Sequence, residues 1–411
     1  MIVIAVVGLV PLSQAYSLLT HEQIIDILWK DEITPLLLKR FPQATEKDLQ
    51  KAHAYAYGGC LVQDMGYYPL GNKFFTDLTH YVRSGDFVAN LIKESTNLNE
   101  YAYALGALAH YSADNSGHPS INRAVALSFP RLRKKFGDEV TYEEDPKAHI
   151  RVEFGFDMTQ VSKNRYTSQQ YHDFIGFEVS KSVLERAFLK TYDLPLDGVL
   201  RPVDLSIGTF RRAASTIIPE LTRVALEVQQ PAAVKDKPNA DQRLFLYHLS
   251  RSEYEREWGK DYRQPSFLAR FLAFILRWVP KVGPLKALVF EIPSQETEDI
   301  YIKSVNKSVA NYRETLRQIG AGHLELPNLD FDTGRKSRAG EYALGDKTYV
   351  KLLDKLNDRG LKNVKPDLRE NILVYFSGTS KIHPHCPKER KAWRKAVVEL
   401  DVLKRGDPVA H

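Results

Sequence analysis

The chain has 411 residues, 43% of them hydrophobic and 26% charged, which is typical of a globular protein with one large domain or two ordinary ones. The formal charge of +6 is a small excess that suits an anionic substrate or surface but does not by itself indicate one. Only two cysteines occur, Cys60 and Cys386, which excludes a fold held by several disulfides. One bridge would fit this count, although two unreactive thiols are the simpler expectation.

Residues 1–15 have the pattern of a signal peptide. An apolar run that ends at Val10 is followed by Ser13 and Ala15, small residues at the −3 and −1 positions of a cleavage site. We therefore expect a secreted or periplasmic protein whose mature chain begins at Tyr16. No Lys or Arg precedes the apolar run, so a buried strand is the alternative interpretation. No later run reaches the roughly 20 apolar residues that a membrane-spanning helix needs.

The N-terminal half has a helical pattern. From Thr20 to about residue 130, apolar and aromatic residues recur at intervals of three and four. Residues 231–242 contain two prolines and several charges without periodicity, which is typical of a domain boundary or a long surface loop. The sequence thus predicts an all-α protein with a helical domain over 16–230 and a mostly helical extension over 231–411.

The C-terminal half also contains helical patterns. Apolar residues between Ile302 and Ile319 alternate spacings of three and four, and Gly320 then provides a stop. Residues 321–347 are rich in glycine and polar residues, so we expect a long loop. The segment 267–279 is apolar except for two arginines on one face, which suits either a core helix or a helix lying in a lipid interface.

The most informative spacing joins His110, Asp114 and His118 at positions i, i+4 and i+8. At about 100° per residue, these side chains span about 80° of one helix face. His149 and Glu153 repeat the i, i+4 spacing. Imidazole and carboxylate groups together are a ligand set that suits Zn²⁺.

Further candidate ligands precede this helix. Asp64 and His80 lie among small and aromatic residues, where a buried carboxylate is costly unless it is paired or bound to a metal. His21, five residues after the expected N-terminus, completes the series. His53 does not fit it and is interpreted as a packed helix histidine.

In residue type and order this series resembles the zinc-dependent phospholipase C family. That family includes bacterial phosphatidylcholine-cleaving phospholipases and the N-terminal domain of the glycosylphosphatidylinositol-specific phospholipase D, which has the same three-residue gap between the equivalents of Asp114 and His118. The chain is similar, more distantly, to fungal single-strand nucleases, which have five residues in this gap. The resemblance covers roughly residues 16–160 and implies a multi-helix bundle.

The resemblance implies a site of three zinc ions. One ion would be bound by Asp64, His80, His110 and Asp114, and a second by His118, His149 and Glu153. Asp114 would bridge to a third ion, held by His21 and by the free amino group and carbonyl oxygen of Tyr16. Asp64 would either orient the attacking water or accept its proton, or serve as a ligand alone.

Such a site suits hydrolysis of a phosphodiester. We therefore expect an exported zinc-dependent phosphodiesterase that acts on a phospholipid head group or a related phosphodiester, with 267–279 as a candidate for peripheral membrane contact. A single-strand nuclease is the first alternative, for which Tyr57, Tyr67, Tyr68 and Tyr81 are candidate base-stacking residues. The second is a surface-binding module that keeps zinc for stability without turnover.

Overall fold

The computed structural model describes residues 18–163, 175–218, 290–377 and 386–405. Several sequence-based predictions fall elsewhere in the chain. These are the signal peptide over 1–15, the ligand Tyr16, the boundary at 231–242 and the helix at 267–279.

The prediction of an all-α fold is confirmed. The α-helices are α2 (Leu18–Leu28), α3 (Thr34–Arg40), α4 (Glu46–Gly59), α5 (Lys73–Tyr81), α6 (Ser84–Glu94), α7 (Leu98–Ser128), α8 (Pro130–Phe136), α9 (Pro146–Ser162), α11 (Lys181–Tyr192), α12 (Val203–Arg212), α16 (Gln295–Gly320), α17 (Ala343–Asn357), α18 (Pro366–Tyr375) and α19 (Pro387–Arg405). Short 3₁₀ and π-helical segments are η1 (Trp29–Ile33), η2 (Val62–Tyr67), η3 (Leu196–Gly198), η4 (Ala213–Ile217) and η7 (Leu361–Asn363). The strands β1 (Leu329–Asp330) and β2 (Arg335–Lys336) form one antiparallel pair.

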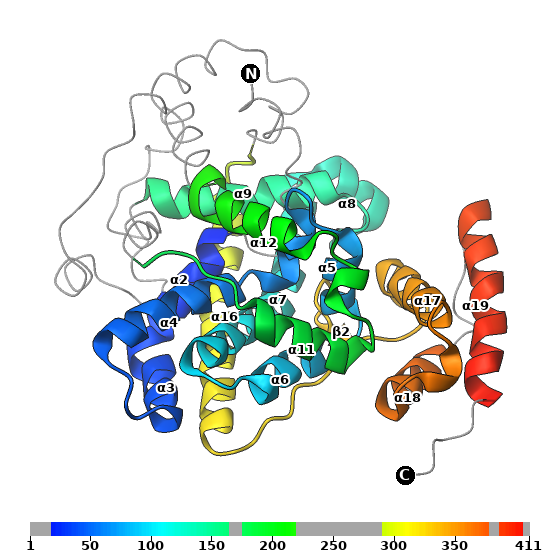
Figure 1. Cartoon of the computed structure of the whole chain (residues 1–411). Helices are drawn as coiled ribbons and strands as arrows, with labels where there is room; N and C mark the ends of the chain where they lie inside the picture. The colour runs from blue at the N-terminus through cyan, green and yellow to red at the C-terminus, as the bar shows by residue number, and fades with distance from the viewer. Residues whose placement is uncertain (1–17, 164–174, 219–289, 378–385, 406–411) are drawn as a thin grey trace, which may run out of the picture.

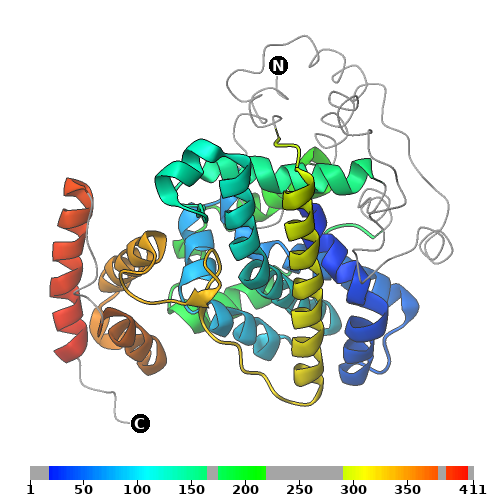
Figure 2. The same ribbon diagram turned by 180° about the vertical axis from the view of Figure 1, so that it is seen from behind.

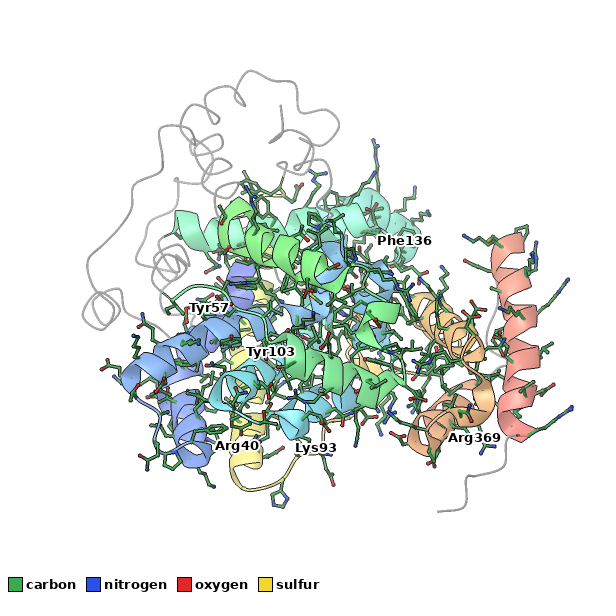
Figure 3. All side chains as sticks on the ribbon, in the orientation of Figure 1. Arg40, Tyr57, Lys93, Tyr103, Phe136 and Arg369 are labelled. Carbon is green, nitrogen blue, oxygen red and sulfur yellow. The ribbon has the colours of Figure 1, made fainter. Side chains whose placement is uncertain are left out.

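The long helix α7 lies at the centre of the molecule, and α4 and α16 pack along it (Figures 1 and 2). Tyr57 of α4 and Tyr103 of α7 are fully buried, whereas Lys93 of α6 is exposed (Figure 3). Helices α4 and α7 approach closely because glycines face the partner backbone. A Cβ atom on Gly106 would lie 2.1 Å from the carbonyl oxygen of Ala56.

Helix α16 confirms the helix predicted over 302–319, and it begins earlier, at Gln295, where the Ser294 side chain caps the N-terminus. It belongs to the same apolar core as α7, because Val305 and Val309 are buried in that core. The Tyr312 hydroxyl donates to the carbonyl oxygen of Leu105 on α7, at 2.8 Å. The division into domains at 231–242 stays a prediction, but α16 packs with the N-terminal helices.

The long loop predicted over 321–347 is only partly correct. It contains the two strands, and α17 begins at Ala343, inside the predicted loop. The glycines do mark turns, since Gly322, Gly334 and Gly340 have positive φ angles. The prediction was wrong at 343–347, because these residues were included in the glycine-rich loop although they form the first turn of α17.

Helices α17, α18 and α19 lie together on one side of the bundle, beyond the hairpin 329–336 (Figure 1). Arg83 ties this group to the bundle. Its side chain donates to Asp86 at 2.7 Å and to Asp367 of α18 at 2.8 Å.

Cys60 and Cys386 are both free. Among the described residues, no helix combines the length and apolar character needed to cross a membrane.

Candidate metal centre

Helix α7 brings His110, Asp114 and His118 to one buried face, as their spacing predicts. The Asn97 side chain accepts from the backbone N–H of Glu100 and caps the start of this 31-residue helix. Pro119 follows His118 directly and has no N–H to donate to the carbonyl oxygen of Asn115.

Four other elements supply the remaining side chains. His21 lies on α2, Asp64 on η2, His80 at the end of α5, and His149 and Glu153 on α9. The eight side chains of this cluster are all at most 4% exposed: His21, Asp64, His80, His110, Asp114, His118, His149 and Glu153.

The structure brings these eight side chains into three groups, in each of which the candidate ligand atoms lie within 4.8 Å of one another. The groups are His21, His110 and Asp114; Asp64, His80 and His110; and His118, His149 and Glu153. Asp114 joins them, because its oxygens lie 3.5 Å from His21 Nε2 and 3.6 Å from His118 Nε2. The groups therefore form one continuous cluster.

Backbone carbonyl groups fix the tautomers of three of the histidines. A carbonyl oxygen only accepts, so the ring nitrogen facing it must carry the proton. His80 Nδ1 donates to Thr76, and His110 Nδ1 donates to Cys60, at 3.0 and 2.9 Å. His149 Nε2 donates to Val140 at 2.6 Å. In the neutral ring the other nitrogen has a free lone pair, which in each case faces the cluster, as in metal-binding histidines.

The cluster fits a metal better than it fits a hydrogen-bond network. Within the described part of the chain, the carboxylate oxygens of Asp64 and Asp114 face only imidazole nitrogens, the nearest being His110 Nε2 at 3.1 Å from Asp114 Oδ2, and none of these contacts has the alignment of a hydrogen bond although both side chains are fully buried. Such carboxylates are costly unless a cation compensates them. The nitrogen of His80 and the nearest oxygen of Asp64 are 3.3 Å apart. Two ligands of a tetrahedral zinc with bonds of about 2.0–2.2 Å lie about 3.3–3.6 Å apart.

Burial and mutual charge shift the pKa values within the cluster. Burial, with the neighbouring His110, lowers the pKa of His21 to about 3, and burial with His118 lowers that of His149 to about 4. Burial would also lower the pKa of His80, but the carboxylates of Asp114 and Asp64 together raise it to about 10. Burial raises the pKa of Glu153 well above its usual value. His21 and His149 are thus neutral at pH 7, the form in which imidazole binds metals.

Asp157 anchors the helix that carries His21. It lies on α9, one turn after Glu153, and its carboxylate accepts from the backbone N–H of Leu19 at 2.9 Å and from the Thr20 hydroxyl at 2.7 Å. Asp157 therefore caps the N-terminus of α2, where a negative charge is favourable.

His53 lies apart from the cluster, as its interpretation requires. It stacks on Trp29 at a ring distance of 3.8 Å, and its Nε2 is 2.9 Å from Asp26 Oδ1. It therefore packs α4 against the end of α2 and the start of η1. Asp86 accepts hydrogen bonds from Arg83 and Asn328.

Sequence analysis missed Asp332 and Phe331, which lie in the hairpin 329–336. Asp332 is 2% exposed, and its Oδ1 lies 3.4 Å from Nε2 of His118. The Phe331 ring is fully buried 5.0 Å from His80 and 5.9 Å from His110. The only signal for them was the sequence Asp-Phe-Asp within a loop otherwise rich in glycine and cations.

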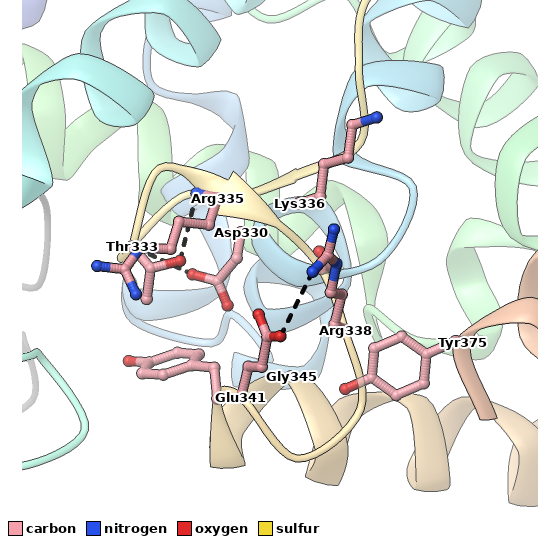
Figure 4. Close-up of a pocket in the computed structure, with 10 residues that line it drawn as sticks. Asp330, Thr333, Arg335, Lys336, Arg338, Glu341, Gly345 and Tyr375 are labelled. Carbon is pink, nitrogen blue, oxygen red and sulfur yellow. Dashed lines mark hydrogen bonds and ion pairs between the residues drawn. The ribbon is translucent and has the colours of Figure 1, made fainter. Parts of the chain in front are cut away.

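A cavity of about 250 Å³ lies beside this hairpin, and Gly345 of α17 and Tyr375 of α18 also line it (Figure 4). Its lining includes Arg335, Lys336 and Arg338, together with Asp330 and Glu341. Tyr342 also lines the cavity and donates a hydrogen bond to Asp332. This hydrogen bond connects the lining of the cavity to Asp332, which faces His118.

Residues 20–199 match the family model described as zinc dependent phospholipase C. This segment contains all eight cluster side chains, and the match supports the resemblance to that family. No curated protein and no solved structure matches the chain. The hairpin 329–336 lies outside the matched segment.

Proposed function

We propose that the chain is an exported phosphodiesterase that uses three zinc ions to hydrolyse a phospholipid head group or a related phosphodiester. The observation that supports this most is the convergence of eight buried imidazoles and carboxylates from α2, η2, α5, α7 and α9. The match of residues 20–199 to a zinc-dependent family supports the choice of metal. Zinc in such a site polarises phosphoryl oxygens and makes water a better nucleophile near neutral pH.

The proposed roles follow the three groups of side chains. His118, His149 and Glu153 would hold one ion, and Asp64, His80 and His110 a second. Asp114 would bridge from the second ion to a third beside His21. The free amino group of Tyr16 is proposed as a further ligand of that third ion, and this residue lies outside the described part of the chain.

Asp64 is the proposed acceptor of the proton from the attacking water. Both of its oxygens face the cluster without a hydrogen-bond partner among the described residues. A purely ligating role would be indicated if the Asp64→Asn variant lost zinc and activity in proportion.

Aromatic side chains enclose the cluster and affect the choice between lipid and nucleic acid. Tyr67 lies 6.5 Å from the ring of His80, and Tyr142 lies 6.1 Å from that of His149. Of the tyrosines considered for base stacking, Tyr57 and Tyr81 are fully buried within the protein. Stacking on single-stranded bases needs exposed rings, so this observation favours the phospholipid.

The test is a comparison of substrates. The purified mature protein is incubated with choline-headed lipid, single-stranded nucleic acid and a chromogenic phosphodiester, each with and without a chelator. We expect chelator-sensitive release from the lipid and the chromogenic compound. Release from the nucleic acid alone would identify a nuclease, and zinc without any turnover would identify a binding module.

The role of Tyr16 has a separate test. A tag fused directly to the Tyr16 amino group should reduce the zinc content by one ion and leave the other ions bound. Unchanged metal stoichiometry in the tagged protein would contradict this part of the proposal. A protein with a tag at the C-terminus is the matched control.

A further inference from the structure

We propose that Asp332 is an additional ligand of the metal site, binding through Oδ1 the ion that His118 binds. This inference rests on the proposed zinc site, and it extends that site into the C-terminal half of the chain. Asp332 lies 133 positions beyond residue 199, where the segment that matches the family ends.

The position of Oδ1 fits a ligand. It lies 3.4 Å from His118 Nε2, within the distance of about 3.3–3.6 Å expected for two ligands of one tetrahedral zinc. The same nitrogen lies 3.6 Å from Asp114 Oδ2, so His118 Nε2 faces two carboxylates. A single N–H on this nitrogen cannot donate a good hydrogen bond to both carboxylates, but both carboxylates can bind a cation placed between them.

The rest of the carboxylate is held in place. Oδ2 accepts hydrogen bonds from the hydroxyl groups of Tyr81, at 2.9 Å, and Tyr342. The backbone carbonyl oxygen of Asp332 accepts from the Asn122 amide at 2.9 Å. Asn122 lies on α7, one turn after His118. With Oδ2 and the backbone fixed in this way, Oδ1 is directed at His118, which is how outer hydrogen bonds orient a metal ligand.

The hairpin is fitted closely against α7. Gly334 has a φ of +66°, and a Cβ atom there would lie 2.7 Å from the carbonyl oxygen of Asn115. This is the carbonyl group that receives no helical hydrogen bond because of Pro119. The Phe331 N–H also donates to the carbonyl oxygen of His80, at 3.3 Å. The hairpin is thus attached to both helices that flank Asp332.

The test compares two aspartates of the same hairpin. In Asp332→Asn the amide keeps the shape and can still accept a hydrogen bond from an imidazole, but it lacks the negative charge of a zinc-binding carboxylate. Asp330→Asn is the matched control. Asp330 Oδ1 accepts from the Thr333 N–H, which an amide oxygen can also do, and none of its described hydrogen bonds or ion pairs involves the cluster. Zinc per chain and zinc affinity are measured by metal analysis and by competition with a chromogenic chelator.

We expect Asp332→Asn to lose one ion per chain, or to bind it more than about 100-fold more weakly, which exceeds the roughly 10–100-fold effect of an outer hydrogen-bond partner. Asp330→Asn should match the wild type. In the cobalt-loaded protein, Asp332→Asn should also change the visible absorption band that reports coordination geometry. Equal zinc content and affinity in the two variants would overturn the inference.

Two further results separate the possible failures. If the Asp332→Asn variant does not fold, Gly334→Ala is tested in its place. Gly334→Ala keeps the Asp332 carboxylate but displaces the hairpin from α7. Weaker zinc binding would then support the inference, and unchanged binding would overturn it. A wild-type protein that binds zinc but hydrolyses none of the substrates would contradict the proposed function alone. A wild-type protein that binds no zinc would contradict both.

Discussion

The contact between α4 and α7 provides a sharp test of how the bundle positions the cluster. Gly106 of α7 faces α4, and an added Cβ would lie 2.1 Å from the carbonyl oxygen of Ala56. His110 lies one turn later on α7, and its Nδ1 donates to the carbonyl oxygen of Cys60, just after the end of α4. We therefore expect Gly106→Ala to disturb both the core and the metal cluster.

The size of the effect follows from the geometry. An ordinary Cβ contact begins at 3.4 Å, so the atoms must separate by 3.4 − 2.1 = 1.3 Å. The obstacle is backbone and cannot rotate away, which places the cost near the upper end of the range of about 1–3 kcal/mol for overpacking. Alanine in a helix offsets about 0.5–1 kcal/mol of this. The expected net loss of unfolding free energy is about 2 kcal/mol.

The assay is urea unfolding of the zinc-loaded protein, combined with metal analysis. Gly208→Ala on α12 is the matched control, because an added Cβ there has nothing within 4 Å. This control should raise the unfolding free energy by about 0.5–1 kcal/mol through helix propensity. A Gly106→Ala protein as stable as the control, with full zinc content, would refute the argument that the glycine contact positions His110.

Four further predictions concern the cluster and its surroundings. His110→Ala should lose zinc as well as activity, because Asp64 and Asp114 would remain as buried carboxylates with one fewer ligand beside them. Full zinc content in that variant would show that the ligand assignment is wrong. Chelation should lower the unfolding free energy by about 4 kcal/mol for each ion that had been present at 1,000 times its dissociation constant, measured by urea unfolding with and without chelator. Zinc affinity should rise with pH, because the pKa of His80 is raised to about 10 and burial raises the pKa of Glu153, so both side chains must lose a proton to bind zinc. Calorimetry of zinc binding in two buffers of different ionisation enthalpy should therefore detect released protons. Zinc binding without proton release would contradict this prediction. His53→Ala removes a buried ring that stacks on Trp29, so it should lower the unfolding free energy by about 2–5 kcal/mol in urea unfolding, the cost of a large-to-small core substitution. Its zinc content should equal that of the wild type, and a loss of zinc would contradict the placement of His53 outside the cluster.

Helical periodicity was enough to predict the parts of the fold that carry the cluster. His110, Asp114 and His118 share a face because the helical repeat puts positions i, i+4 and i+8 together. The same rule applies to His149 and Glu153 on α9. Within each of these two sets, on α7 and on α9, the regular helix determines which side chains are neighbours. The sequence alone was therefore informative about each helix.

Periodicity could not show how separate helices meet. The approach of Asp64 and His80 to His110 depends on the close contact of α4 with α7. Glycines allow this contact, and no local sequence pattern predicts it. For these positions the prediction came from the family resemblance. The ligand role of Tyr16 has the same origin and stays a prediction.

The hairpin 329–336 shows why the remaining site residues were missed. Its strands have two residues each, too short for an alternating pattern to be recognised. Asp332 reaches the cluster through tertiary contacts, namely the hydroxyl groups of Tyr81 and Tyr342 and the amide of Asn122. None of these is near Asp332 in sequence except Tyr342.

The distribution of buried charge argues that the C-terminal half is part of the functional unit. A buried aspartate has a substantial desolvation cost, and two tyrosine hydroxyl groups satisfy only Oδ2 of Asp332. If the hairpin were only a cover for the helices, an apolar residue at this position would pack beside Phe331 without that cost. Oδ1 is instead directed at His118, which the matched segment supplies. A cation between them would compensate both groups, so the proposed ligand role predicts that the hairpin and the bundle are held together most strongly when the site is loaded.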